Sequence, residues 1–180
     1  MLSLLTPDWP APSRVKALTT TRQGGVSVGP YAGLNLGEHV EDDPHHVAAN
    51  RRLLREHLPD EPWWLTQTHS TRVLEAGAEG IDGDGSFTSS IQTVCAVMTA
   101  DCLPALFCNR QGTQVAAAHA GWRGLAAGVL EAAVDSFDDA PSEILVWLGP
   151  AIGPQAFEVG PEVREAFMAT HPQTANAFVP

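Results

Sequence analysis

The sequence predicts an α+β fold, because strand-like apolar runs occur both as a turn-linked pair and beside helix-like segments. The clearest pair comprises residues 103–108 and 113–118, which flank the Gly-containing turn 109–112. The clearest helix signals are Asp43, which is followed by a proline at a typical helix start, and an apolar stripe within 126–137. Hairpins mixed with helices favour α+β over a strictly alternating parallel fold.

Each expected element has a local signal. An early strand covers residues 14–20, and a helix that opens at Pro44 extends to about Leu58, where Pro59 ends it. Further strands are expected at 72–75, 93–99, 103–108, 113–118 and 144–148. A helical stripe before the last strand contains Ala126, Val129, Leu130, Ala133 and Phe137. A final helix opens at Pro161 and carries Val163, Phe167 and Met168.

Length and composition limit the function classes. With 180 residues and a hydrophobic fraction of 44%, we expect one domain over residues 1–180 with its own core. No apolar run reaches the roughly 20 residues of a membrane span, and the apolar start is too short for a signal peptide. Three unevenly spaced cysteines indicate a reducing cytoplasm rather than a disulfide framework. The net charge of −11 argues against nucleic acid and favours a small-molecule substrate; monomer and homodimer stay open.

Three separated residues carry the strongest chemical signal: His69, Cys102 and His119. Each lies where an apolar run gives way to small or polar residues. If residues 109–112 close a symmetric hairpin, Cys102 lies directly opposite His119, with their Cβ atoms roughly 4.5–5.5 Å apart. A one-residue change in the loop would place the two side chains on opposite faces.

Several chemistries fit this trio. Two imidazoles and a thiolate suit zinc and leave a fourth position for water or substrate, and copper accepts similar ligands. A Cys–His nucleophilic pair, with Cys102 attacking and His119 as base, is a second reading that has no need of His69. A third is that Cys102 is a buried small hydrophobe and the histidines are unrelated.

The segment after His119 adds a candidate anion site. Gly121 and Gly124 allow close backbone approach, a helix start follows, and Arg123 offers a guanidinium suited to phosphate. Arg22, which precedes two glycines, has the same character. The alternative is that the glycines only turn the chain and that both arginines are solvated surface charges.

Together these segments resemble the YfiH family, also called laccase-domain or multicopper polyphenol oxidase-like proteins. The resemblance runs from about residue 19 to residue 163. The motifs that carry it are residues 20–27 (TTRQGGVS), 34–37 (LNLG), 67–70 (QTHS), 99–104 (TADCLP), 119–124 (HAGWRG), 148–154 (LGPAIGP) and 157–160 (FEVG).

The resemblance implies a layered α/β/β/α sandwich with mixed sheets, related to Cys–His deamidases and necrotizing-factor toxins. It also implies a zinc-dependent purine nucleoside phosphorylase, a transferase acting on adenosine, inosine, guanosine and methylthioadenosine, with hydrolytic adenosine deamination as a side activity. The metal would be held by His69, Cys102 and His119, with copper as the alternative to zinc. A copper-dependent polyphenol oxidase and a metal-free Cys–His amidohydrolase remain alternative functions.

The implied substrates are a purine nucleoside and phosphate, with no nucleic-acid or membrane partner. Arg22, Asn35 and Arg123 are expected to bind substrate or phosphate. Asp101 is expected to orient the catalytic site or move a proton, although a structural role fits equally well. Family members continue with further strands and a helix beyond residue 180, so we expect this chain to lack the C-terminal part of the family domain.

Overall fold

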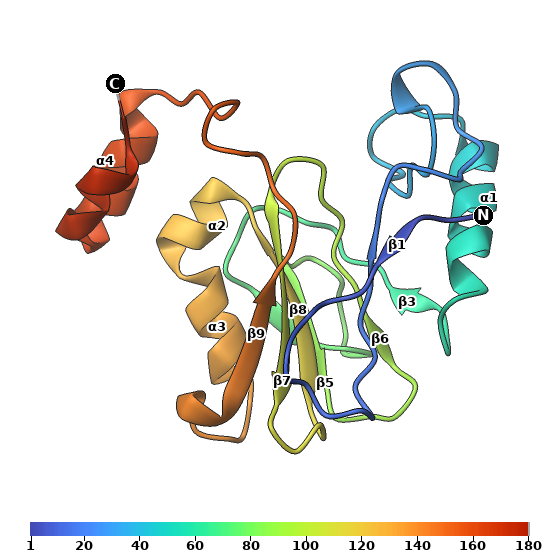
Figure 1. The fold of residues 1–180 in the computed structure, drawn as a ribbon, viewed down its shortest axis with the longest axis horizontal. Coiled ribbons are helices and arrows are strands. Elements are labelled where there is room, and N and C mark those ends of the chain that lie inside the picture. The colour runs from blue at the N-terminus through green and yellow to red at the C-terminus, as the bar shows by residue number, and fades with distance from the viewer. Residues whose placement is uncertain (180) are drawn as a thin grey trace.

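A five-stranded sheet forms the centre of the computed structural model, which describes residues 1–179 (Figure 1). Its strands are Val73–Glu75 (β4), Gly85–Thr88 (β5), Leu103–Asn109 (β7), Val115–Ala120 (β8) and Ile144–Leu148 (β9). They lie in the order β4-β5-β8-β7-β9, with β4 and β5 parallel and the other neighbours antiparallel. Two short sheets accompany it: antiparallel Leu4–Leu5 (β1) with Thr19–Thr20 (β2), and parallel Pro62–Trp63 (β3) with Val94–Cys95 (β6).

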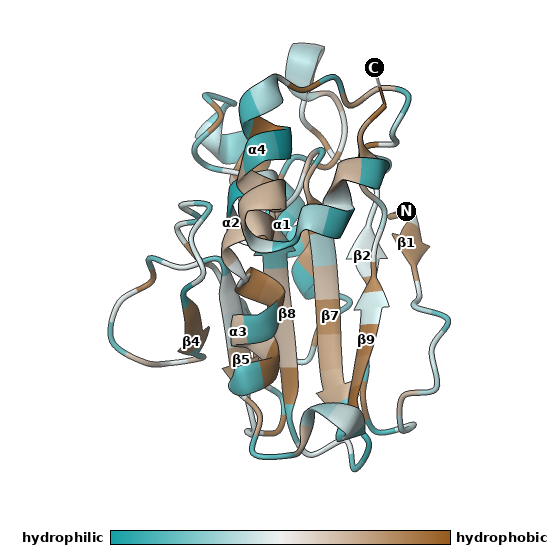
Figure 2. Ribbon diagram, turned by 90° about the vertical axis from the view of Figure 1, so that its left-hand side faces the viewer, coloured by the Kyte–Doolittle hydropathy of each residue, from teal (hydrophilic) through white to brown (hydrophobic). Residues whose placement is uncertain are grey.

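The helices lie on both sides of this sheet. They span Pro44–Arg55 (α1), Trp122–Ala127 (α2), Val129–Asp135 (α3) and Pro161–Thr170 (α4), and short 3-10 turns cover Gly29–Tyr31, Pro141–Glu143 and Pro172–Ala177. Figure 1 shows α2 and α3 on one side and the N-terminal segments with α1 on the other; in Figure 2 α3 lies over β5 and β8. The expected α+β class is therefore confirmed. None of the helices within residues 1–179 has both the length and the apolar character that crossing a membrane requires.

The main core lies between the sheet and α3. Alternate residues of β7 and β8 face the helices, and most of them are alanines, so the helix can approach the sheet closely. Phe107 fills the remaining volume and is 2% exposed. The buried cluster consists of Ala105, Phe107, Ala116, Ala118, Ala120, Val129, Ala133 and Phe137. The opposite face of the same strands is thereby left for the functional groups.

The β7–β8 hairpin exists, but the expected register was wrong. Pro104, not Cys102, lies opposite His119, because the loop consists of residues 110–113 rather than the expected residues 109–112. The buried amide of Asn109 causes this shift: its Oδ1 accepts from the Thr113 and Gln114 N–H groups, at 2.8 and 3.2 Å, and closes a four-residue loop that lies one position further along the chain. A slip of two residues preserves the face. Cys102 and His119 therefore remain on one face as diagonal rather than opposed neighbours.

Other expected elements differ in extent. The helix from Pro44 ends at Arg55. The strands expected at residues 14–20 and 93–99 are shorter in the structure, where they correspond to β2 and β6. The expected single helix over residues 126–137 is two helices, because Gly128 takes a left-handed φ of 99° and ends α2. Strand β5 was missed, since its residues, Gly-Ser-Phe-Thr, carry no apolar alternation. The relationship to Cys–His deamidases and necrotizing-factor toxins stays a prediction.

Candidate metal centre

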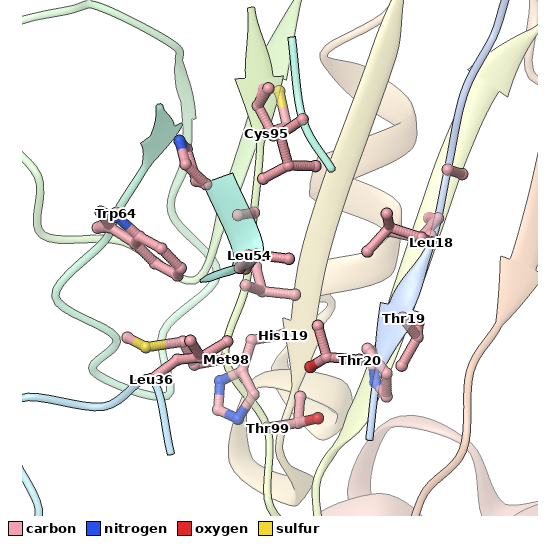
Figure 3. Close-up of a pocket in the computed structure, with 18 of the residues that line it drawn as sticks. Leu18, Thr19, Thr20, Leu36, Leu54, Trp64, Cys95, Met98, Thr99 and His119 are labelled. Carbon is pink, nitrogen blue, oxygen red and sulfur yellow. The ribbon is translucent and has the colours of Figure 1, made fainter. Parts of the chain in front are cut away.

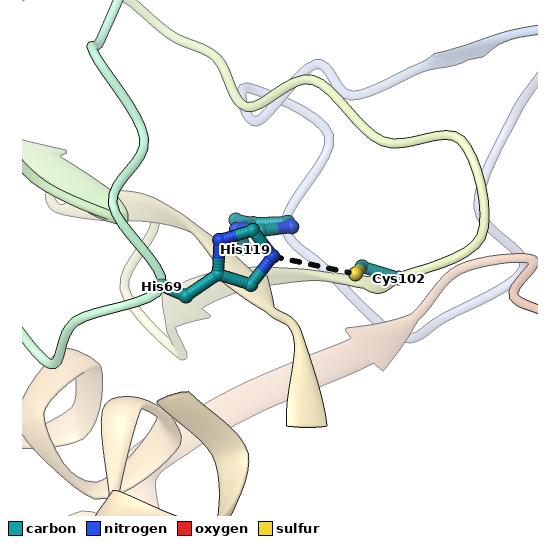
Figure 4. A group of neighbouring side chains, drawn as sticks. All are labelled: His69, Cys102 and His119. Atoms are coloured by element: carbon teal, nitrogen blue, oxygen red, sulfur yellow. Dashed lines mark hydrogen bonds between the residues drawn. The ribbon is translucent and has the colours of Figure 1, made fainter. Parts of the chain in front are cut away.

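His69, Cys102 and His119 converge at one point (Figure 4). One potential ligand atom from each lies within 4.8 Å of the other two, and Cys102 Sγ is 4.0 Å from His69 Nε2. His119 is buried, Cys102 is half-buried and His69 is exposed. The cluster is thus anchored in the sheet and open to solvent on one side.

Three separate segments supply these side chains. His119 belongs to β8, and Cys102 directly precedes β7, so the hairpin places both at the same end of the sheet. His69 lies on the connection between β3 and β4 and has a positive φ of 58°, which is uncommon for a residue with a side chain. Gln67 joins that connection to the Cys102 segment: its Oε1 accepts from Met98 N–H at 2.7 Å, and its Nε2 donates to Met98 C=O at 2.8 Å.

The His119 ring is oriented by Asp84, a residue that the sequence reasoning missed. His119 Nδ1 lies 2.9 Å from Asp84 Oδ1, and its backbone N–H donates to the Asp84 carbonyl at 2.7 Å. Burial raises the pKa of the Asp84 carboxyl, but hydrogen bonds from His119, Ser70 and Thr68 outweigh burial and bring the pKa below its ordinary value. Asp84 directly precedes β5, so recognising that strand beside β8 would have placed this carboxylate next to His119.

The Cys102 thiol has the opposite environment. Burial raises its pKa above the ordinary cysteine value, and the nearby carboxylates of Asp101 and Asp84 raise it further. A nucleophilic cysteine needs the reverse, a lowered pKa beside a positive charge. The surroundings of Cys102 therefore favour a metal ligand, which gives up its proton on binding, over a free thiolate nucleophile.

The donor set fits a tetrahedral metal ion. With bond lengths of about 2.0–2.3 Å, two ligand atoms on one zinc ion lie roughly 3.3–3.6 Å apart. The separations in this cluster, up to 4.8 Å, need only small side-chain adjustments to reach that spacing. Within residues 1–179 this is the single group of three or more His, Cys, Asp or Glu side chains so arranged. The cluster could therefore hold one metal ion through three protein ligands.

Gly121 makes room for this cluster. A Cβ at this position would lie 2.5 Å from His69 Cδ2 and 3.2 Å from Cys102 Sγ. Its φ of −62° and ψ of 156° suit any residue, so the requirement for glycine is spatial rather than conformational. The backbone of residue 121 thus forms one wall of the metal centre.

The cluster opens into a cavity of about 710 Å³ between the sheet and the N-terminal segments (Figure 3). Its walls are largely apolar and include Leu18, Leu36, Trp64 and Met98, with His119 at one end. Among the other expected site residues, Asp101 and Asn35 also line this cavity. An apolar hollow with a few convergent polar groups is the usual form of a small-molecule site.

The arginines and Asn35 are already engaged in local contacts. Arg22 donates through Nη2 to the Ala32 carbonyl at 2.9 Å, and the Arg123 guanidinium lies 4.4 Å from the centre of the Trp122 ring. Asn35 Nδ2 donates to Asp42 and to the Gly37 carbonyl, which uses both amide hydrogens. Neither arginine is among the described residues that line the cavity. The structure thus brings the trio together and places Asn35 on the wall of the same cavity, but neither Arg22 nor Arg123 lines it.

Comparisons with known proteins agree with this architecture. Residues 16–180 match the sequence profile of the family described as multi-copper polyphenol oxidoreductase laccase. A Pseudomonas aeruginosa protein named purine nucleoside phosphorylase PA4543 is 60% identical over 100% of this chain and 75% of its own length. Purine nucleoside phosphorylase YfiH of Escherichia coli is 56% identical over 99% of this chain and 76% of its own length.

Solved structures share the fold. Neisseria meningitidis protein NMB0706 superposes with a TM-score of 0.93 at 50% identity, over 98% of this chain and 74% of its own. YlmD from Geobacillus stearothermophilus superposes with a TM-score of 0.80 at 34% identity, over 88% of this chain and 67% of its own. The resemblance seen in the sequence motifs therefore extends over nearly the whole chain.

We predict that Gly121→Ala weakens metal binding by roughly 1–3 kcal/mol, because the added methyl group displaces the His69 ring from Cys102. The measurement is a competition titration of purified protein against a chromogenic chelator. Gly153→Ala is the matched control, since a Cβ there meets no atom within 4 Å. Equal metal affinity in both variants would contradict the steric role of Gly121.

Proposed function

The chain belongs to the family described as multi-copper polyphenol oxidoreductase laccase, and from this membership we propose that it is a zinc-dependent purine nucleoside phosphorylase. The observation that carries the proposal is the His69, Cys102 and His119 cluster at the end of a cavity within the size range of small-molecule sites. The names of the Pseudomonas and Escherichia relatives support the substrate class. Broad specificity for purine nucleosides and a side activity in adenosine deamination belong to the same proposal.

Zinc is the proposed metal because it binds both imidazole and thiolate, and because catalytic zinc sites have three protein ligands and one open position. When bound, zinc would supply Lewis-acid chemistry at its fourth position. Copper also accepts these ligands, and the family description names it. A multicopper oxidase needs several metal clusters, however, and the described residues provide one. This count favours the phosphorylase over a copper-dependent polyphenol oxidase.

The proposed reaction exchanges one bond at the ribose. A phosphate oxygen forms a bond to C1′ as the bond from C1′ to the purine breaks, and the departing purine takes up a proton. We propose that Asp101, on the cavity wall, orients the site or moves that proton. The apolar walls would hold the base and keep bulk water from competing with phosphate.

Phosphate binding is assigned to the two arginines, with Arg123 as the stronger candidate. It lies two residues beyond Gly121, whose backbone contacts the cluster, and its side chain is exposed and free of carboxylate partners among residues 1–179. Arg22 would have to leave its contact with Ala32 to reach an anion. For Asn35, the hydrogen bonds favour holding the loop at the cavity wall over direct contact with substrate.

The first test of this function concerns the metal. Protein purified without added metal should contain about one zinc per chain, and His69→Ala, Cys102→Ser and His119→Ala should each sharply reduce that content, because three ligands hold the ion. Elemental analysis is the measurement. Cys95→Ser and His57→Ala change the same residue types in the cavity wall outside the cluster and should leave zinc unchanged. Full zinc content in the three cluster variants would refute the site.

The second test concerns the reaction. Incubation with adenosine and phosphate should release adenine together with ribose 1-phosphate, and omission of phosphate should abolish adenine release, because phosphate is the proposed nucleophile. Product chromatography is the measurement. Adenine release that persists without phosphate would identify hydrolysis and overturn the phosphorylase proposal. Turnover of phenols only with added copper would instead support the oxidase.

The third test separates phosphate binding from metal binding. Arg123→Ala should raise the phosphate concentration for half-maximal phosphorolysis roughly ten- to a hundredfold, which corresponds to the loss of a charge-assisted contact. Arg22→Ala should have an effect in the same direction, and neither variant should lose zinc. Arg164→Ala removes the same charge from α4 and serves as the control. Unchanged phosphate dependence in both site variants would show that the two arginines are solvated surface charges that do not bind phosphate.

A further inference from the structure

The Asp84 carboxylate contacts two of the three cluster residues at once. It is 0% exposed and receives six hydrogen bonds, five from the segment 68–70 and one from the His119 ring. An isolated buried charge is strongly unfavourable, so this number of donors is what allows the carboxylate to remain there. Asp84 does not belong to the cluster itself. Its contacts suggest a role in arranging the cluster.

On the His69 side, the carboxylate fills a concavity of backbone N–H groups. The N–H groups of Thr68, His69 and Ser70 donate to it at 3.1, 2.9 and 2.6 Å. Successive N–H groups converge in this way when one residue adopts the left-handed conformation, and such an arrangement binds anions. The positive φ of His69 is therefore explained by the anion inside the loop, and that conformation sets the direction of the His69 side chain.

On the His119 side, the carboxylate decides which ring nitrogen carries the proton. A carboxylate only accepts hydrogen bonds, so Nδ1, at 2.9 Å from Asp84 Oδ1, must be the protonated nitrogen of the neutral ring. The lone pair of the neutral ring is then on Nε2. A metal ligand needs an available lone pair, and a carboxylate partner of this kind orients many metal-bound histidines.

We propose that Asp84 is the positioning residue of the metal centre, which selects the Nε2 lone pair of His119 and holds His69 in its left-handed conformation. This inference rests on the metal dependence proposed above. It concerns the arrangement of the ligands in the metal-free protein, so it can be tested separately from activity.

The variant Asp84→Asn gives a specific expectation because an amide cannot accept at both ends. If Nδ2 replaces Oδ2, it faces the N–H groups of Thr68 and Ser70; if Nδ2 replaces Oδ1, it faces only the His69 N–H. The second orientation leaves fewer unpaired backbone groups. In that orientation Nδ2 donates to His119 Nδ1, which moves the ring proton to Nε2 and blocks the proposed ligand atom.

The test is nitrogen-15 NMR of the histidine rings in metal-free protein at alkaline pH, combined with zinc affinity by chelator competition. In the wild-type protein, His119 should carry its proton on Nδ1. In Asp84→Asn the proton should move to Nε2, and zinc affinity should fall roughly 10–100-fold. A wild-type His119 protonated on Nε2 would overturn the proposal without any variant, as would Asp84→Asn with an unchanged tautomer and unchanged affinity.

A matched control separates positioning from general stability. Asn50, on α1, is also 0% exposed, makes four side-chain hydrogen bonds to groups of the segment 26–35, and contacts neither the cluster nor the β7–β8 hairpin through these bonds. Asn50→Ala should lower the melting temperature but leave the His119 tautomer and zinc affinity unchanged. Equal loss of zinc affinity in both variants would show that Asp84 stabilises the fold without positioning the cluster, and would overturn the proposal. Wild-type protein with the Nδ1 tautomer but no zinc affinity would refute the proposed function and not the ring orientation.

Discussion

The candidate metal centre depends on a single buried carboxylate, that of Asp84, which connects a loop to the central sheet. The sheet alone aligns His119 and Cys102, because both lie at the open end of the β7–β8 hairpin, opposite its loop. His69 belongs to a connection outside that hairpin and reaches the cluster through the hydrogen bonds of segment 68–70 to Asp84. Since a buried charge is stable only when its hydrogen bonds are satisfied, the loop and the His119 ring are ordered together.

Small residues then bring the parts of the centre into contact. Alanines on the helix-facing side of β7 and β8 allow α3 to approach, while the opposite face of these strands borders the cavity. Gly121 lets the chain pass beside the His69 ring before α2 begins. The same strands therefore carry a tightly packed core on one face and an open chemical site on the other. This division follows from the alternation of side chains along a strand.

The charge of the chain constrains how it can bind phosphate. A net charge of −11 creates a field that repels a phosphate dianion, so binding requires local cations and N–H donors strong enough to overcome it. The cavity walls contribute Lys16 and several histidines, and the two candidate arginines lie beyond the walls. Phosphorolysis at this centre would therefore involve movement of an arginine toward the cluster. Arg123 is the simplest candidate, because within residues 1–179 its guanidinium contacts the Trp122 ring and no carboxylate.

The sequence by itself determined what depends on residues close together in the chain. Local propensity and side-chain chemistry made several features predictable: the Asp43 cap and Pro44 start of α1, the extent of β9, the Pro161 start of α4 and the residue types of the three candidate ligands. The tertiary structure alone decided the hairpin register, which a buried amide at Asn109 sets, and the role of Asp84. Both result from contacts that periodicity and spacing do not encode: the partners of a buried polar group are known only when distant segments have packed around it.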